Sequence, residues 1–346
     1  MISYFECNFF EKEFEASRNF SIIQNEINLK QKLQNNKFSF EKKQIEYFCK
    51  WLPNNLWDAK KPCILMPIKD NLRLLKITLE NFQNNNVLDL ANVIVIDDRS
   101  TEDLVPTSTA VASYLRIDNN KGFNFSMLLN IAAGICRSMG AKEVLLWNCD
   151  LWCPNAEALP ELLRRHRDSN SVVSGAKLLY PPASMSLNDE KDTENIKKIS
   201  KNMLNGKWRE TVQYGGDTWI LTPGNNTGIH PVHLKRFAAA NNPIVNCNRG
   251  VCFLTGALHV WNLEKYIELG GLNPSLARNF QDVDLCLKAL QKNYIPLYFG
   301  KDLYFYHDES AVFNNLIGEA KYNKQMESDN VLFGKIWNKK IMELIF

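Results

Sequence analysis

The sequence predicts an α/β fold in which a mostly parallel β-sheet is flanked by helices. Short apolar runs without polar alternation recur along the chain, as in VIVID at 93–97, and such runs are typical of strands buried on both faces. Amphipathic stretches of helix length separate these runs, and this alternation favours a sheet covered by helices. The chain has 346 residues, 45% of them hydrophobic, which is enough for a sizeable core.

The first 60 residues show a different pattern. The segment 10–33 places Phe, Ile and Leu between charged residues at roughly helical spacing. Pro53 breaks this pattern, and Lys60-Lys61-Pro62 marks a new start. We therefore expect residues 1–60 to form a helical N-terminal extension, which would serve as an oligomer contact or a docking element.

From residue 63 onward, apolar runs alternate with amphipathic stretches. The expected strands are 63–67, 93–98, 113–118 and 143–150, and the expected helices between them are 72–83, 126–140 and 155–166. Residues 166–250 are less regular. Later segments predict a strand entering a helix at 251–261, a helix at 282–293, a strand at 295–299 and an amphipathic, basic tail.

Aspartates stand at the ends of two expected strands. Asp97 and Asp98 close the strand 93–98, and the apolar run 144–147 stops on Asn148-Cys149-Asp150. In open α/β sheets, ligands bind beyond the carboxyl ends of the strands, where a carboxylate can accept hydrogen bonds from a ribose or ligate a divalent ion. The alternative is that these are turn and capping residues, since Asp and Asn favour both positions.

Two more candidates lie late in the chain. Asp282 begins an expected helix, and it is either a cap or first-turn acid or a general base that takes a proton from a hydroxyl group. His307 follows the aromatic run LYFY. It is either a packed histidine or a metal ligand, and the second role needs an acidic partner from elsewhere in the chain.

Composition and charge argue against several other classes. The net charge of +3 gives no reason to expect a nucleic-acid partner. The N-terminus carries acids where a signal peptide needs an apolar core, and no apolar run approaches the ~20 residues that span a bilayer. The nine cysteines are odd in number and form no CxxC pair, which fits reduced thiols. These observations predict a soluble cytoplasmic protein.

Taken in order, the segments resemble nucleotide-sugar-dependent glycosyltransferases of the GT-A fold, especially the large inverting family, family 2. The match covers roughly 61–310. It consists of an opening strand and helix at 63–82, a nucleotide motif at 93–103 with Arg99 where Gly is common, an Asn-x-Gly stretch at 120–135, LLWNCD in place of the DxD metal motif, a Gly-Gly turn at 255–276 and QDVDL in place of the EDVDL helix.

The resemblance implies a Rossmann-like, mostly parallel sheet flanked by helices, with helical N- and C-terminal additions. The nucleotide-sugar-binding half would be 61–165, the acceptor-binding and catalytic half 166–310, and a helical tail 311–346. The donor would be held by Pro67, Asp97, Asp98, Lys121 and Asn148. Mn²⁺ or Mg²⁺ on the donor diphosphate would be ligated by Asp150 and His307. Asp282 would be the catalytic base of a single displacement that inverts the anomeric centre.

Two residues depart from the family pattern. Asn148 replaces the first acid of the metal motif, so we expect modest metal affinity because the site holds less negative charge. Gln281 replaces the acid before the expected base, where it would orient the acceptor without adding a second negative charge.

The acceptor side is less specific in sequence. Trp208, Tyr214, Trp219 and Trp261 are candidates either for stacking on sugar rings or for core packing, and Asp217 and His230 are candidate polar contacts. The segment 330–346 carries apolar residues among Lys335, Lys339 and Lys340. Two interpretations stay open for it: a helix lying on an anionic membrane surface, or a helix packed on the core or on a partner subunit.

The expected function is therefore a metal-dependent inverting glycosyltransferase, a hexosyl- or N-acetylhexosaminyltransferase. It would move a sugar from a nucleotide sugar, UDP-sugar by default, to a glycan or lipid-linked glycan of capsule or lipooligosaccharide, at the inner face of the membrane. A nucleotidyltransferase is disfavoured because MPIKDNLR (66–73) lacks a glycine-rich basic loop. The alternative is a catalytically degenerate module that binds nucleotide sugar or glycan, since Asn148 and Gln281 replace acids.

Overall fold

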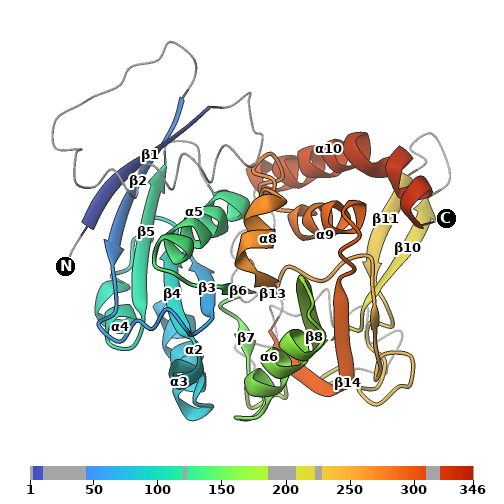
Figure 1. Ribbon diagram of the computed structural model, residues 1–346, viewed down its shortest axis with the longest axis horizontal. Helices are drawn as coiled ribbons and strands as arrows, with labels where there is room; N and C mark the ends of the chain where they lie inside the picture. The colour runs from blue at the N-terminus through green and yellow to red at the C-terminus, as the bar shows by residue number, and fades with distance from the viewer. Residues whose placement is uncertain are drawn as a thin grey trace.

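The computed structural model describes residues 3–10, 44–119, 123–185, 208–222, 228–308 and 320–345 (Figure 1). One mixed sheet runs through the molecule. Its strands, in spatial order, are β1 (Ser3–Phe10), β2 (Gln44–Leu52), β5 (Ser113–Asn119), β4 (Asn92–Asp97), β3 (Cys63–Ile68), β6 (Glu143–Trp147), β13 (Leu258–Asn262), β8 (Val173–Leu179), β14 (Leu297–His307) and β12 (Asn248–Gly250). Two short strands belong to the same sheet but lie outside this order: β7 (Leu151–Trp152) pairs with β14, and β9 (Val212–Tyr214) pairs with β8.

The predicted α/β class is confirmed. Strands β5, β4, β3 and β6 are parallel neighbours, and they correspond to the four expected strands of the first half. Strand β13 then runs antiparallel between β6 and β8, while β8 and β14 are parallel. The parallel strands therefore end at one edge, and that edge carries the aspartates that the sequence singles out.

Eight helices are described in these parts of the chain, and they cover the sheet. They are α2 (Leu72–Asn84), α3 (Val87–Leu90), α4 (Val105–Thr109), α5 (Phe125–Ser138), α6 (Ala158–Asp168), α8 (Leu263–Glu268), α9 (Gln281–Gln291) and α10 (Ala320–Ile345). In the view of Figure 1, α5, α8 and α9 lie above the middle of the sheet and α2, α3 and α6 lie below it. None of these helices is both long enough and apolar enough to cross a membrane.

Local sequence explains where the first two long helices begin. The side chain of Asn71 accepts a hydrogen bond from the amide of Leu74 at 3.1 Å, and that of Asn124 accepts one from Met127 at 3.0 Å. Each asparagine therefore satisfies an amide that the first turn of the helix leaves without a partner. Helix α2 then buries Leu75, Leu79 and Phe82 at helical spacing, as its sequence pattern predicts.

The expectation of a helical N-terminal extension is wrong for its described residues. Residues 44–52 form strand β2, which pairs antiparallel with β5, and β1 pairs with β2. Cys49 and Trp51 alternate onto the core face and are buried. An uncovered β5 would leave a row of main-chain groups unpaired, and β2 satisfies them. The helical pattern spans 10–33, of which 11–33 lie outside the described residues.

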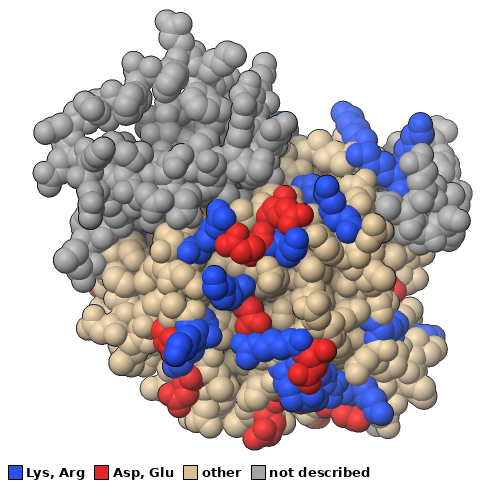
Figure 2. Space-filling model, viewed as in Figure 1, with Lys and Arg blue, Asp and Glu red and all other residues tan. Residues whose placement is uncertain are grey.

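The C-terminal segment is helical, as expected. Helix α10 buries Phe333, Trp337 and Ile341, and the indole N–H of Trp337 donates to Asp284 Oδ1 of α9 at 2.8 Å. Lys335 and Lys339 remain exposed, and Figure 2 shows basic side chains, Lys or Arg, over α10. These three apolar residues thus pack on the body of the protein, which is one of the two interpretations that the sequence leaves open.

Strand β14 contains an irregularity that matters for the site. Phe299 pairs with Ala176 of β8, but the next residue of β8, Lys177, pairs with Tyr304. Residues 300–303 therefore bulge out of the ladder. After the bulge, the end of β14 pairs with β7 so that His307 lies opposite Leu151.

Candidate active site

The turn after β4 is held by Asp97, which is fully buried. Its Oδ1 accepts the amide of Ser100 at 2.7 Å. Its Oδ2 accepts hydrogen bonds from the Tyr114 hydroxyl and, at 3.0 Å, from Arg116 Nη1. Burial and the bond to Asp97 raise the pKa of Tyr114, so this hydroxyl stays a donor. Both oxygens of Asp97 are thus engaged by the protein itself.

Asp98 is also fully buried, and cations surround it. Arg99 Nε lies 2.9 Å from its Oδ1 and Arg99 Nη2 lies 3.3 Å from its Oδ2, while Lys69 Nζ is 3.9 Å from Oδ2. Arg99 makes this contact from a left-handed backbone with φ 55°. If Asp98 holds a nucleoside, as the sequence predicts, the guanidinium group of Arg99 therefore has to move away from its carboxylate.

A loop that the sequence analysis did not single out closes this corner. Asp70 accepts hydrogen bonds from the amide and the hydroxyl of Thr101, at 2.6 and 2.9 Å, and from the amide of Glu102 at 3.2 Å. Its own amide donates to Ser100 Oγ at 2.7 Å. The turns after β3 and β4 are therefore fastened together. The signal in the sequence is the Asp70-Asn71 pair, separated by two residues from the expected strand 63–67, because such pairs favour side-chain turns.

Pro67 lies in β3 opposite Ile96 of β4. Proline is rare inside a sheet because it cannot donate to the ladder. The pairing of β3 with β6 ends at Leu65. Pro67 lies two residues later, so its missing N–H removes no hydrogen bond between these two strands. Lys121, the other residue predicted on the donor side, lies outside the described residues.

The strand end that carries Asp150 is folded back toward β14. After β6, the amide of Leu151 donates to the carbonyl of Asn148 at 3.1 Å, and the amide of Asp308 donates to the carbonyl of Asp150 at 2.9 Å. Because His307 and Leu151 are ladder partners, His307 Nε2 comes within 3.3 Å of Asp150 Oδ1. Asn148 Nδ2 lies 3.4 Å from the same ring nitrogen.

This corner can hold a divalent cation together with ligands from elsewhere. Asp150 Oδ1 is buried and accepts no hydrogen bond, although a buried carboxylate oxygen normally has partners. Two ligands at about 2.1 Å from one ion and at right angles are about 3 Å apart, close to the 3.3 Å seen here. No cluster of three or more His, Cys, Asp or Glu exists in the described ranges. Most of the ligands would therefore be diphosphate oxygens and water.

Asp282 lies in the first turn of α9, two residues after the N-cap position held by Phe280. Its Oδ2 accepts the amide of Gly256 at 2.6 Å, and its Oδ1 accepts the amide of Val283 at 2.8 Å. A Cβ at position 256 would come within 3.1 Å of Asp282 Oδ2, so the close approach suits glycine. Burial raises the pKa of the Asp282 carboxyl group.

The backbone brings these two groups together. The amide of Asn148 donates to the carbonyl of Ala257 at 3.1 Å, and the neighbouring Gly256 holds Asp282. Consecutive Cα atoms are about 3.8 Å apart, so the turn that carries Asp150 and the helix that carries Asp282 are attached to adjacent residues. A carboxylate–imidazole pair and a second carboxylate of raised pKa thus share one corner of the sheet.

The two neighbours of Asp282 in the helix differ in environment. Gln281 is 8% exposed, and its buried Oε1 has no hydrogen-bond partner. Asp284 is fully buried, accepts from Trp337 and forms an ion pair with Lys288 Nζ at 2.6 Å. Asp284 therefore binds α10 to α9, a role that the sequence pattern did not reveal.

The candidates on the acceptor side separate clearly by burial. Trp208, Tyr214 and Trp261 are buried. All three therefore pack in the core and are not available to stack on a sugar ring. Trp219 is only partly buried and packs on Phe253 with ring centroids 5.4 Å apart. Asp217 accepts the amide of Cys252 at 2.9 Å, and burial raises its pKa. His230 is exposed.

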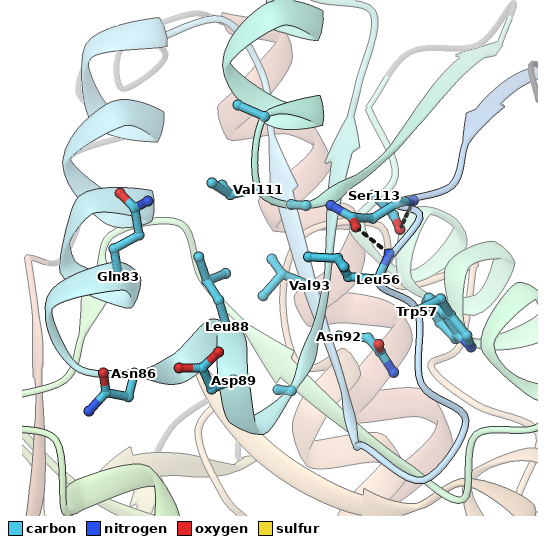
Figure 3. Close-up of a pocket in the computed structure, with 14 residues that line it drawn as sticks. Leu56, Trp57, Gln83, Asn86, Leu88, Asp89, Asn92, Val93, Val111 and Ser113 are labelled. Atoms are coloured by element: carbon cyan, nitrogen blue, oxygen red, sulfur yellow. Dashed lines mark hydrogen bonds between the residues drawn. The ribbon is translucent and has the colours of Figure 1, made fainter.

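A cavity of about 310 Å³ lies at the other edge of the sheet (Figure 3). It is lined by residues at the amino ends of β4 and β5, including Asn92 and Ser113, and by Leu56 and Leu88. Asp89 is the one charged residue among its lining residues. Because no lysine or arginine lines it, this cavity does not suit a diphosphate, which favours the carboxyl edge for a nucleotide.

Comparisons with known proteins give matches in structure but not in sequence. No family model and no curated protein matches the sequence. Two of the solved structures that are similar in shape, each at 12% identity, serve as examples. One is GalNAc-T7 with UDP, GalNAc and Mn²⁺, with a TM-score of 0.48; the similarity covers 72% of this chain and 44% of that one, so it spans less than half of GalNAc-T7. The other is the mannosyltransferase PcManGT from Pyrobaculum calidifontis in complex with GDP-Man and Mn²⁺, with a TM-score of 0.43 and coverage of 95% and 81%.

At TM-scores below 0.5, these likenesses carry no argument about this chain. The chemistry open to it follows from its own strand order and from the corner where Asp150, His307 and Asp282 lie.

Proposed function

We propose that the protein is a metal-dependent inverting glycosyltransferase that moves a sugar from a nucleotide sugar to a glycan hydroxyl. The supporting observation is the pairing of two kinds of carboxylate at one corner. Asp150 has a buried oxygen open to a cation, and Asp282 has a raised pKa and is held by the residue next to the one that anchors Asn148.

The residues that would hold a cation are Asp150 and His307. A bound Mn²⁺ or Mg²⁺ supplies positive charge that offsets the negative charge of a leaving diphosphate. Asn148 adds an uncharged side chain beside His307, so the protein contributes one carboxylate and the metal affinity is modest. On the donor side, Pro67, Asp98 and Lys121 remain our proposed contacts, and Asp97 supports them. Asp97 acts there through the turn that it holds.

Asp282 is proposed to take the proton of the acceptor hydroxyl. A carboxylate of raised pKa is a stronger base than an exposed aspartate. The two amides that bind it fix its direction. The hydroxyl oxygen attacks the anomeric carbon from the face opposite the diphosphate, which leaves as its bond to the sugar breaks. Because this is one displacement, the anomeric centre is inverted.

The finer assignment follows the sequence resemblance. We propose a hexosyl- or N-acetylhexosaminyltransferase that takes a UDP-sugar and extends a glycan or lipid-linked glycan of capsule or lipooligosaccharide. The proposed place is the cytoplasm, with peripheral contact at the inner face of the membrane. The exposed lysines of α10 support contact with an anionic surface. A homo-oligomer remains part of the proposal.

The decisive experiment measures nucleotide release from UDP-, GDP-, CMP- and dTDP-sugars, with Mn²⁺ and with EDTA. We expect release from one donor that Mn²⁺ supports and EDTA abolishes. No release, together with no thermal shift from any nucleotide, would refute the enzyme and the donor site together.

One observation favours a second candidate, a binding module without turnover. Arg99 and Lys69 already neutralise Asp98, and Asn148 and Gln281 replace acids. Nucleotide-induced stabilisation without release from any donor, in the presence of a glycan acceptor mixture, would favour this module over the enzyme.

A further inference from the structure

Helix α10 contacts the loop just before α9, the helix that carries Asp282, through a buried acid. Asp329 is fully buried, although it lies in a helix whose neighbouring positions 327, 328 and 330 are exposed. Its Oδ2 accepts the amides of Arg278 at 2.8 Å and of Asn279 at 3.0 Å. Its Oδ1 accepts Gln325 Nε2 at 2.8 Å. A carboxylate that receives three hydrogen bonds in this way is fixed in place.

The two amides belong to a short connection that we call the bridge loop, residues 273–280. On its other side the bridge loop binds the start of α5. The side chain of Asn124 donates to the carbonyl of Pro274 at 2.8 Å, and the amide of Phe125 donates to the carbonyl of Ala277 at 2.9 Å. The bridge loop is thus held between α5 and α10.

The bridge loop leads directly into Asp282. Its last residue, Phe280, has a left-handed backbone with φ 60° and packs on Phe333 of α10, with ring centroids 4.6 Å apart. The carbonyl of Phe280 accepts the amide of Asp284 at 2.8 Å. Residues 278 and 279 therefore fix where the helix starts, and Asp282 follows only three residues after the second amide.

We propose that Asp329 is a positioning residue, which sets the direction of the Asp282 carboxylate by holding the bridge loop. The inference rests on the proposed function for the role of Asp282, but not for the ordering of the loop. It explains why a buried charge is placed in α10, far along the sequence from the site. It also gives α10 a role in turnover, in addition to the structural role that Trp337 has in packing this helix on α9.

The test uses the full-length protein and three variants. Asp329→Asn keeps the size of the side chain but replaces one accepting oxygen by a donor. Gln325→Ala removes only the bond to Oδ1 and is the milder variant. Glu327→Gln is the matched control, since it changes the same charge at an exposed position of the same helix. Each is compared by kcat and donor KM for nucleotide release, and by hydrogen exchange of peptides that cover 276–285.

We expect Asp329→Asn to lower kcat by about 10- to 100-fold, because misplacement of a reacting group by about 1 Å has effects of this size. Donor KM should stay within about twofold, since the bridge loop acts on the base and not on the diphosphate. The amides of 278–283 should exchange faster. Gln325→Ala should change kcat and exchange in the same direction by less, and Glu327→Gln should match the wild type.

Two results would overturn the proposal: a kcat of Asp329→Asn equal to that of the control, whatever the exchange of the loop, or unchanged exchange at 278–283. A loss of kcat with unaltered exchange would mean that Asp329 acts by some other route. If the wild type releases nucleotide from no donor, the proposed function fails, and the exchange comparison still decides whether Asp329 orders the loop. If Asp329→Asn does not fold, Gln325→Ala supplies both readouts.

Discussion

The carboxylates at the end of β4 differ in their partners from those at the end of β6 and the start of α9. Asp97, Asp98 and Asp150 are buried, and Asp282 is partly buried. Asp97 uses both oxygens on partners within the protein, and Asp98 is matched by Arg99 and Lys69. Asp150 Oδ1 accepts no hydrogen bond, and its neighbour is His307 Nε2 at 3.3 Å. Asp282 is held only by backbone amides and has a raised pKa.

This difference separates acids that build a site from acids available for chemistry. Removing one partner of a closed, buried ion pair mainly costs stability, because the other charge is left uncompensated. Replacing an acid that has an oxygen without a hydrogen bond, or that is bound only by backbone amides, mainly lowers activity. The comparison therefore predicts opposite consequences for substitutions that look alike in the sequence.

The largest expected effect is that of Asp282→Asn. Without the base, kcat should fall by about 10²- to 10⁴-fold, while donor binding measured by calorimetry remains. Asp168→Asn, an exposed acid of α6, is the control. A variant that keeps wild-type turnover would show that Asp282 is only a first-turn acid.

The pH dependence follows from the raised pKa of Asp282. As pH falls through that pKa, the base becomes protonated, so turnover should decline at a higher pH than the ordinary aspartate value would give. Stability changes in the opposite direction. Because the folded state raises the pKa of Asp282, the proton that it binds stabilises the fold below the pKa of the unfolded state, and this stabilisation is lost as pH rises through the pKa of the folded state. At neutral pH, Asp282→Asn should therefore lose activity without a matching loss of Tm. A parallel fall of Tm and kcat would contradict this.

Asp150→Asn should come next. We expect metal-supported nucleotide release to fall by about 100-fold, because a neutral amide is a poor ligand for a hard cation. The free energy of unfolding should change little, since Asp150 Oδ1 has no hydrogen bond to lose. Release at saturating Mn²⁺ equal to that of the wild type would move the cation site elsewhere.

Asp97→Asn should show the opposite profile. Its Oδ2 pairs with Arg116 and Tyr114, so the free energy of unfolding should fall by about 3 kcal/mol. This is measured by urea unfolding. The donor KM of the folded fraction should stay near that of the wild type. A stable protein with a greatly raised donor KM would place Asp97 in direct contact with the nucleotide.

The smallest expected effect is that of Arg99→Gly. Glycine adopts the left-handed backbone without strain, which recovers about 1 kcal/mol, and this offsets part of the lost pair with Asp98. Asp98 would then be free to accept from a ribose or a base, and we expect donor KM to fall by about threefold. A higher donor KM would instead show that Arg99 itself contacts the nucleotide.

Much of the fold could be predicted from the sequence because the strands of the first half are continuous apolar runs. The strand ends at Asp97, Asp98 and Asp150 follow from those runs. Partners could not be predicted, because the contacts between Asp150 and His307 and between Asp282 and Gly256 join residues that are 157 and 26 positions apart. The strand at 44–52 was missed because its pairing with β5, and not its local periodicity, decides its structure.

The bulge at 300–303 in β14 has a consequence for how the gene can tolerate insertions and deletions. Residues 300–303 have no ladder partner in β8, so the two-residue alternation of side chains does not fix their number. Loss of one codon from the bulge is therefore compatible with an unchanged ladder from Tyr304 onward, in which His307 still lies opposite Leu151. Within the ladder itself, by contrast, a shift of one residue turns every following side chain to the other face. The bulge is thus the part of β14 in which a change of length can leave the contact between Asp150 and His307 intact.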